Sequence, residues 1–293
     1  MAAILTIISF AVTLCCGGVC EINDTLWIEQ GCYGSFENAF RMTLGVEGII
    51  YIIDASRNEL IALREDDSKS RSIGGFGWGG GSFDRPTGIA SDGLNIYVSD
   101  FGNHRVLRFD RNLNLISALY TRDTSYSFAR FGYPTGIALS RLGDLFILDS
   151  ENLRVLKFSQ SSRFERTFGE KEKAKGRIRN PIKIICSNND HIYVLEPERI
   201  LEYDYFGAFI RVIGDGQFSN AVSFDVSDNG FLVASEQLIY EISNQGILKA
   251  KYILEHILKD KTLRKINDLF IINDKIYLLS DRTLCKFTVT TVQ

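Results

Sequence analysis

The pattern of apolar and polar positions within residues 83–110 predicts three short β-strands. Apolar residues fall in three runs, at 87–90, 96–98 and 106–109. Serine, aspartate, asparagine and glycine separate the runs, and these residues favour the tight turns of β-hairpins. Three hairpin-linked strands form a meander that cannot bury its apolar faces alone. The chain must therefore supply further units of the same kind.

Residues 131–158 repeat this pattern. The sequence Pro-Thr-Gly-Ile-Ala begins at Pro86 and again at Pro134, and Asp-x-x-Asn-x-Arg-Val begins at Asp100 and again at Asp149. Repeats of about 40–50 residues that each carry several short strands are typical of β-propellers. The repeats therefore predict a propeller.

The two units resemble the NHL-repeat family of β-propellers. The resemblance rests on the Pro-x-Gly-Ile-Ala motif, on the strand end from Tyr97 to Asp100, and on Asn103-His104-Arg105 before an apolar strand. It implies a propeller fold. A related propeller, an amidating lyase, is similar to zinc enzymes whose metal is held by histidine ligands. Other related propellers, the lactonases, have calcium ligands in the central channel. The resemblance therefore leaves an enzymatic role open.

The end of the middle strand of each unit is a marker for counting units. It recurs at intervals of 39 to 49 residues, at Asp54, Asp100, Asp149, Glu196, Ser235 and Ser280. We therefore predict an all-β fold, with residues 21–293 forming one six-bladed β-propeller of four-stranded antiparallel blades.

The sixth unit lacks a fourth strand, because only residues 288–293 follow its third strand. Residues 26–39 are similar to 209–221, which are read as an outer strand and the loop into the next blade. We expect a ring-closing strand at about 25–30 to complete the last blade beside residues 284–287, which removes the open edge.

Residues 252–265 interrupt the strand pattern between the fifth and sixth blades. Apolar residues at Ile253, Leu254, Ile257 and Leu258 have the spacing of one face of a helix. We expect a short helical insertion there.

The N-terminus carries an uncharged apolar run at residues 2–14, followed by small residues and cysteines. Such a run is too short to span a bilayer and indicates a signal peptide at residues 1–20. We expect an exported protein, periplasmic or extracellular, without a membrane span. A lipid anchor on Cys15, Cys16 or Cys20 is the alternative, although the residues before them do not fit the lipoprotein pattern.

Composition and cysteine content change this picture little. A net charge of −3 with 24% charged residues is ordinary for a globular protein and does not suggest nucleic-acid binding. Beyond the N-terminal segment, Cys32, Cys186 and Cys285 are an odd number without metal-binding spacing. We expect Cys186 and Cys285 to be small buried residues of strands, and we expect no structural disulfide.

The three histidines, His104, His191 and His256, fall in different units, so the sequence predicts no shared metal site and no cofactor. The glycine-rich segment 74–81 leads into a strand at Pro86, whereas a dinucleotide-binding loop opens a helix. It is therefore interpreted as a connection between blades.

Three carboxylates, Asp54, Asp100 and Asp149, recur at one repeat position. We interpret each of them as an acceptor for backbone N–H groups of its own turn, as in an Asx-type turn, because every blade needs a turn there. Arg105 and Arg154, five residues later, are candidate pairing partners. A ring of ligands for a divalent cation is the alternative.

The topology gives the best functional signal, because antiparallel strands alternate in direction. The turns between second and third strands and the loops that join blades must emerge on one face. These loops are long and carry aromatic and basic residues, which are typical of binding surfaces. The candidate binding residues are Trp78, Phe101, His104, Tyr126, Phe128, Arg130, Lys173, Arg177 and Arg179.

We therefore predict a non-enzymatic binding or scaffold protein that presents this loop-rich face to a protein, peptide or glycan. An exported metal-dependent hydrolase or lyase that uses the central channel is the alternative, since propellers host both kinds of function.

Overall fold

The computed structural model describes residues 25–64, 70–170, 175–258, 263–272 and 274–291, and these residues form six four-stranded sheets. Strands that are neighbours in a sheet pair antiparallel throughout. We number the blades in chain order and give the strands of each from the innermost to the outermost.

Blade 1 comprises β2 (Ala39–Leu44), β3 (Ile50–Asp54), β4 (Glu59–Leu63) and β5 (Arg71–Gly74). Blade 2 comprises β6 (Pro86–Ser91), β7 (Asn95–Asp100), β8 (Arg105–Asp110) and β9 (Leu115–Tyr120). Blade 3 comprises β10 (Pro134–Leu139), β11 (Leu145–Asp149), β12 (Arg154–Phe158) and β13 (Phe164–Phe168).

Blade 4 comprises β14 (Lys183–Cys186), β15 (Ile192–Glu196), β16 (Arg199–Tyr203) and β17 (Phe209–Ile213). Blade 5 comprises β18 (Ala221–Ser227), β19 (Gly230–Ser235), β20 (Leu238–Ser243) and β21 (Leu248–Ile253). Blade 6 comprises β22 (Asp268–Ile272), β23 (Lys275–Leu279), β24 (Leu284–Thr291) and β1 (Thr25–Tyr33).

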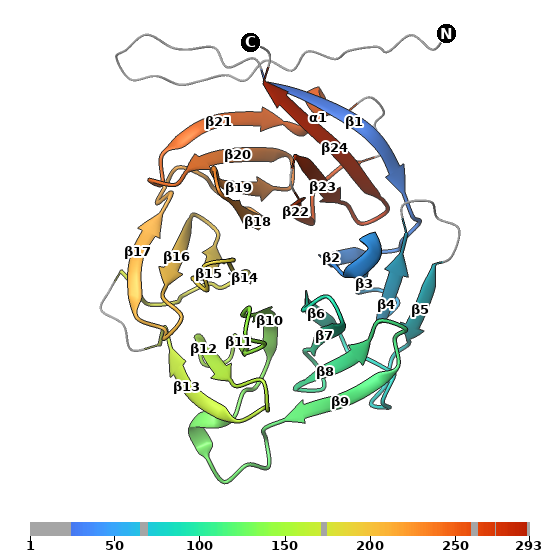
Figure 1. Ribbon diagram of the computed structural model, residues 1–293, viewed down its shortest axis with the longest axis vertical. Helices are drawn as coiled ribbons and strands as arrows, with labels where there is room; N and C mark the ends of the chain where they lie inside the picture. The colour runs from blue at the N-terminus through green and yellow to red at the C-terminus, as the bar shows by residue number, and fades with distance from the viewer. Residues whose placement is uncertain (1–24, 65–69, 171–174, 259–262, 273, 292–293) are drawn as a thin grey trace.

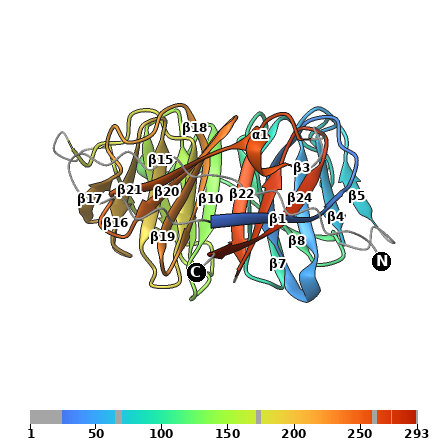
Figure 2. The ribbon, with the colours of Figure 1, turned by 90° about the horizontal axis from the view of Figure 1, so that it is seen from above.

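The six sheets stand around a common centre and form a flat disc, which confirms the predicted six-bladed propeller (Figures 1 and 2). The second strands of blades 1 to 5 end at the marker residues read from the sequence, and β23 ends one residue before Ser280. The repeat interval was a reliable guide because each blade needs the same turn at the same place.

Apolar side chains of neighbouring blades pack against each other between the sheets. For example, Val106 of blade 2 shares one buried cluster with Ile137 and Ile147 of blade 3. Since a blade is covered on both faces, a middle strand such as β11 is buried at every position. Such strands show continuous apolar runs rather than strict alternation.

Strand β1 completes blade 6 by pairing with β24, which confirms the predicted ring closure (Figure 1). Leu26 lies opposite Thr290 and Glu29 lies opposite Phe287. The first and last described strands of the chain thus share one sheet, so the ring has no open gap between blades 6 and 1.

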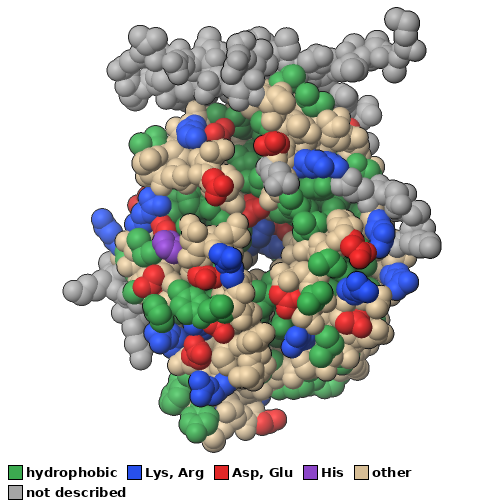
Figure 3. All heavy atoms as spheres, viewed as in Figure 1, with side chains coloured by type: hydrophobic (Ala, Val, Ile, Leu, Met, Phe, Trp, Pro, Cys, Tyr) green, Lys and Arg blue, Asp and Glu red, His purple; other side chains and the backbone are tan. Residues whose placement is uncertain are grey.

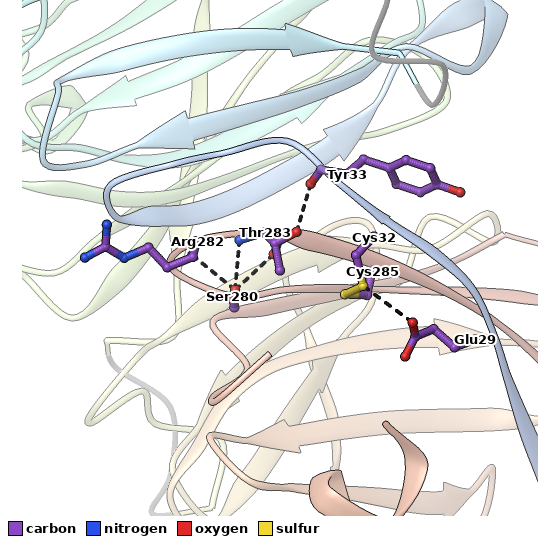
Figure 4. Close-up of a disulfide and its surroundings, with 7 residues drawn as sticks. All are labelled: Glu29, Cys32, Tyr33, Ser280, Arg282, Thr283 and Cys285. Carbon is purple, nitrogen blue, oxygen red and sulfur yellow. Dashed lines mark hydrogen bonds between the residues drawn. A yellow bond between two sulfur atoms is a disulfide. The ribbon is translucent and has the colours of Figure 1, made fainter. Parts of the chain in front are cut away.

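A disulfide joins Cys32 of β1 to Cys285 of β24, so the expectation of no structural disulfide is wrong (Figure 4). The two residues lie opposite each other in the strand register, and the pairing becomes visible only when β1 is placed beside β24. Cys285 is buried, as expected, but as one half of a cross-link. Cys186 is a free, partly buried thiol.

Within the described part of residues 252–265, α1 (Leu254–Ile257) is helical, and residues 252–253 belong to β21. Leu254 and Ile257 are buried in the cluster between blades 5 and 6, so the apolar spacing is explained by one helical turn. Residues 259–262 lie outside the described residues.

Two short 3₁₀ helices complete the elements, η1 (Val46–Gly48) and η2 (Ser127–Ala129). No helix in the described ranges is long and apolar enough to cross a membrane. The expected signal peptide at residues 1–20 lies outside the described part of the chain.

Candidate functional site on the loop face

The loops that join neighbouring blades and the turns between second and third strands lie on one face of the disc, here called the loop face. Backbone hydrogen bonds join the two sets; for example, the Gly102 N–H donates to the carbonyl of Asp84 at 2.8 Å. The blade-joining loops are residues 34–38, 75–85, 121–133, 169–182, 214–220 and 254–267, of which 171–174 and 259–262 lie outside the described residues.

A buried ion pair in blade 2 fixes loop 75–85. The Arg105 Nε donates to Asp100 Oδ2 at 2.7 Å, and both side chains are buried. The other guanidinium nitrogens donate to the carbonyls of Trp78, Gly79 and Ser82 at 2.8, 3.0 and 2.8 Å. Arg105 therefore holds three loop carbonyls and sets the path of the loop.

Asp100 also holds the loop from the other side. Its Oδ1 accepts the backbone N–H of Asp84 at 2.7 Å, and the Asn103 amide bridges Asp100 Oδ2 and the Gly77 carbonyl at 2.8 Å each. Burial raises the pKa of Asp100, although hydrogen bonds from Asn103, Asp84 and Arg105 act in the opposite direction. The partners do not fully offset desolvation, so the pair contributes chiefly geometry.

Blade 3 repeats this arrangement. Arg154 Nε donates to Asp149 Oδ2 at 3.2 Å, and its Nη2 donates to the carbonyl of Arg130 at 2.6 Å. The predicted pairing of Asp100 and Asp149 with arginines five residues later is confirmed. The bound carbonyl belongs to loop 121–133.

Blade 4 achieves the same result with different residues. Arg199 Nε donates to Glu196 Oε2 at 2.5 Å. Its terminal nitrogens donate to the carbonyls of Lys175 and Arg177 at 3.2 and 3.0 Å. We call this unit the carboxylate–arginine clamp: a carboxylate ending the second strand, an arginine beginning the third, and carbonyls of the preceding loop.

Blades 1, 5 and 6 have no such clamp among the described residues. In blade 1, Asp54 accepts backbone N–H groups from loop 34–38 and from its own turn, as interpreted from the sequence. Ser235 Oγ accepts the backbone N–H of Leu238 in its own turn at 3.1 Å. Ser280 Oγ accepts the backbone N–H groups of Arg282 and Thr283 in its own turn at 3.1 and 3.0 Å (Figure 4).

Trp78 is carried at the tip of the clamped loop of blade 2. Its indole is 58% exposed and stacks on Tyr120, with 6.2 Å between ring centroids. Its backbone carbonyl is bound by Arg105, whose guanidinium also lies 5.2 Å from the indole. Phe76, 79% exposed in the same loop, was missed by the sequence analysis although it stands in the same glycine-rich segment.

Phe101 and His104 are only partly exposed and pack with Tyr133. His104 Nδ1 lies 2.6 Å from the carbonyl of Gly132. These contacts give both residues a role in joining a turn of blade 2 to loop 121–133. They are therefore less accessible to a partner than the more exposed residues of the loop face.

Tyr126 and Phe128 are the exposed aromatic residues of loop 121–133, at 63% and 56%. Their ring centroids lie 6.0 Å apart, and Phe128 also contacts Phe164 at 5.9 Å. Arg130 donates twice to the Thr124 carbonyl within the same loop. The loop is therefore held by its own contacts as well as by the clamp.

Arg177 and Arg179 lie exposed on loop 169–182, on either side of the buried Ile178. The Arg177 carbonyl is bound by the clamp arginine, and the backbone N–H of Arg179 donates to Glu196. Lys173, the remaining candidate, lies outside the described residues.

Exposed apolar residues also occur away from the loop face, at positions that no motif of the sequence marks. Single residues project from tight turns of the opposite face: Leu94, Leu142, Phe206 and Ile247. Isolated apolar residues of this kind are ordinary on protein surfaces. The loop face differs because four exposed aromatic residues, Phe76, Trp78, Tyr126 and Phe128, lie on two of its loops.

Charged residues lie at the centre of the disc, and these too were missed (Figure 3). Lys183 Nζ pairs with the buried Asp268 at 2.6 Å, and Ser223 donates to the same carboxylate at 2.5 Å. Arg41 donates to the carbonyl of Asn267 at 2.8 Å. One cavity beside these residues has a volume of about 20 Å³, enough for a single water.

A repeat position explains which residues reach the centre. Gly88 and Gly136 of the two Pro-Thr-Gly motifs occupy it in blades 2 and 3, and a Cβ on Gly88 would lie 2.8 Å from Gly136 Cα. In the other blades the equivalent residues are polar: Arg41, Lys183, Ser223 and Asp268. No group of three potential metal ligands is found within the described ranges.

Comparisons with known proteins agree with this architecture. Residues 83–109 and 131–158 match the NHL repeat. The brain tumor protein of Drosophila melanogaster is 26% identical over 111 residues, which are 36% of this chain and 11% of that protein. The human E3 ubiquitin-protein ligase NHLRC1 is 32% identical over 108 residues, which are 36% of this chain and 27% of that protein. The chain thus matches only a minor part of the length of these relatives.

Among solved structures, a catalytically inactive virginiamycin B lyase from Staphylococcus aureus, crystallised with quinupristin, has a TM-score of 0.60. The alignment covers 98% of this chain and 97% of that one, at 12% sequence identity. At such identity the likeness shows the fold alone. The chain is thus a six-bladed β-propeller in which segments of blades 2 and 3 match the NHL repeat.

Proposed function

We propose that this chain is a non-enzymatic binding module that recognises a partner protein through the loop face. One observation carries the proposal: Trp78, Tyr126 and Phe128 are more than half exposed, while buried clamps hold the loops that bear them. Aromatic residues are the usual anchors of interfaces. Loops that are already ordered lose less conformational entropy on binding.

The chemistry of the face fits a protein or peptide partner better than a small molecule. Exposed aromatic rings lie beside exposed Arg130, Arg177 and Arg179, and aromatic and arginine side chains are enriched at interface hot spots. The name of the human relative, an E3 ubiquitin-protein ligase, supports a protein partner. A glycan remains the alternative ligand for the same rings.

The test is a pull-down from the native host with two sets of variants. The loop set combines Trp78→Ala, Phe128→Ser, Arg130→Ala, Arg177→Ala and Arg179→Ala. Loss of one anchor costs about 1–2 kcal/mol, so the combined set should reduce partner affinity at least about tenfold with little change in melting temperature.

The control set carries Arg141→Ala and Asn189→Ala on the opposite face, and it should bind normally. Loss of binding by the control set alone would place the partner on the other face. Calcium or zinc in stoichiometric amount in the purified protein would overturn the non-enzymatic proposal and favour the metal-dependent hydrolase or lyase.

We also propose that the protein is exported. The Cys32–Cys285 disulfide supports this, because structural disulfides persist in oxidising compartments, and so does the apolar run at 2–14. Mass spectrometry of the protein from its host should find a new N-terminus between residues 15 and 24. Protein that begins at Met1 in the cytoplasm would contradict export.

A further inference from the structure

A groove separates the outer parts of blades 2 and 3. Its volume is about 80 Å³. Its walls include Tyr97, Arg108, Ser117 and Leu119 of blade 2 and Gln160 and Ser162 of blade 3. Because the turn 159–163 of blade 3 belongs to the face opposite the loop face, the groove is a separate surface from the proposed binding face.

Arg108 is the notable residue of this groove. Within the described residues it has no hydrogen bond and no ion pair, and its Nε is buried without a partner. Its guanidinium carbon lies 5.5 Å from the centroid of the Tyr97 ring. A buried N–H of a cation without an acceptor is unfavourable, so a ligand that supplies an anionic acceptor would be stabilised here.

Blade 3 shows how the same position is satisfied internally. Lys157 occupies in β12 the place of Arg108 in β8, opposite an aromatic residue of the second strand. Its Nζ lies 3.2 Å from Asp144 and 3.1 Å from Glu165. The cation of blade 3 is thus paired with two carboxylates of its own blade.

Blade 2 keeps the cation but lacks both carboxylates. By strand register, Asn95 corresponds to Asp144, and Ile116 corresponds to Glu165. The carboxylate of the adjacent turn, Asp92, accepts hydrogen bonds from the Asn95 amide at 2.9 Å. The comparison of the two blades therefore indicates that Arg108 can bind a carboxylate from outside the chain.

The strand beside the groove is also unusual. β9 pairs only with β8, and Leu115, Ile116 and Tyr120 are exposed. It contains no charged residue, whereas β1, β5, β13, β17 and β21, the other outermost strands, each contain at least one. Charged side chains normally protect an open edge against pairing, so β9 is the blade edge best suited to accept another strand.

We propose that β9 and this groove bind an extended peptide segment of a partner protein, which pairs with the edge of β9 and places an Asp or Glu carboxylate on Arg108. Ser117 lies directly opposite Arg108, so only a small side chain separates the guanidinium from the open edge. A strand added beside β9 would lie about 10 Å from β8, a gap that facing arginine and glutamate side chains can close.

The two parts of the site have different roles. Backbone hydrogen bonds to the strand edge supply affinity for any extended segment, and the charge-assisted bond to Arg108 selects an acidic one. This site does not depend on the loop face, so a partner could occupy both surfaces or either one alone.

The experiment is a selection of phage-displayed random dodecapeptides on the full chain, with counter-selection on Arg108→Gln. Selected peptides should share one acidic position within an extended apolar sequence. A synthetic peptide from this pool should bind at least about tenfold more weakly to Arg108→Gln, and its own Glu→Gln version should lose as much. Ile116→Glu, which restores the blade 3 partner, should abolish peptide binding.

Matched controls separate this site from general effects. Ile116→Gln, Arg111→Gln and the loop-set variant without Trp78→Ala, because Trp78 stacks on Tyr120 of β9, should bind the peptide normally. This also keeps the test independent of the proposed function. The proposal falls if no peptide survives counter-selection, or if acetate competes as well as the peptide. It also falls if sedimentation shows that Arg108→Gln converts a dimer to a monomer, because a second copy of the chain would then be the occupant.

Discussion

Blades 2 to 4 and blades 5 to 6 fix the loops that precede them in different ways. Blades 2 to 4 do so with carboxylate–arginine clamps. Blades 5 and 6 have only a serine at the equivalent place. The loop into blade 5 is short, at 214–220, whereas loop 254–267 into blade 6 is as long as the clamped loops.

The long loop into blade 6 is held by apolar packing instead. Leu254, Ile257, Leu263 and Ile266 are buried between blades 5 and 6, and blade 6 is also cross-linked to the N-terminal strand. A loop that packs inward in this way leaves few side chains for a partner. A polar clamp holds the backbone while the side chains point outward, so the comparison associates clamps with binding loops.

The largest effect should come from the cross-link of blade 6. Cys32→Ala with Cys285→Ala should lower the free energy of unfolding by about 4 kcal/mol, because the disulfide constrains a long loop of the unfolded chain. Urea denaturation measures this. Cys186→Ala is the matched control, and an equal loss there would show that the ring closes without help from the cross-link.

Loss of the blade 2 clamp should have the next largest effect. Arg105→Met leaves the buried Asp100 without its cation and should cost about 3 kcal/mol by urea denaturation. Arg85→Met removes an exposed arginine of the same loop and should change little. The double variant Asp100→Asn/Arg105→Met should recover part of the loss; a further decrease would mean that the pair stabilises rather than positions.

The blade 3 clamp should matter less than that of blade 2. The Arg154 side chain is more exposed than that of Arg105, and it donates hydrogen bonds to fewer loop carbonyls than Arg105 does. We expect Arg154→Met to cost about 2 kcal/mol. Hydrogen exchange at residues 126–133 should rise in this variant, and unchanged protection there would argue that contacts within the loop are sufficient.

The serine of blade 5 should have the smallest effect. Ser235→Ala removes one hydrogen bond to the Leu238 N–H and should cost about 1 kcal/mol. The measurement is the same urea titration. A cost equal to that of Arg105→Met would remove the contrast between the two halves of the ring.

Local repeat chemistry made the fold readable from the sequence. Turn residues recur at fixed offsets, so the marker series from Asp54 to Ser280 located every blade. The lack of a fourth strand in the last unit indicated that the N-terminal strand, β1, closes the ring. The repeat also predicted a structural role for Asp100 and Asp149 and their pairing with Arg105 and Arg154. The backbone donors to these two carboxylates are Asp84 and Gly132 of the preceding loops, however, and not residues of their own turns.

Long-range partners were not readable in this way. Cys32 and Cys285 are 253 residues apart, and nothing local to either shows that they meet. Trp78 stacks on Tyr120, which belongs to another strand. Arg108 Nε has no hydrogen-bond partner, whereas Lys157 of the next blade is paired with carboxylates. Both observations depend on neighbours from other strands.

The sequence by itself determined the blade, its turns and the number of repeats, because these depend on backbone preferences within a few residues of each other. Only the tertiary structure decided which side chains remain without a partner and which loops are fixed. Those properties depend on the register between strands and on packing between blades. That Ile116 of blade 2 stands where blade 3 has the acidic residue Glu165, for example, becomes apparent only when the strands of the two blades are aligned.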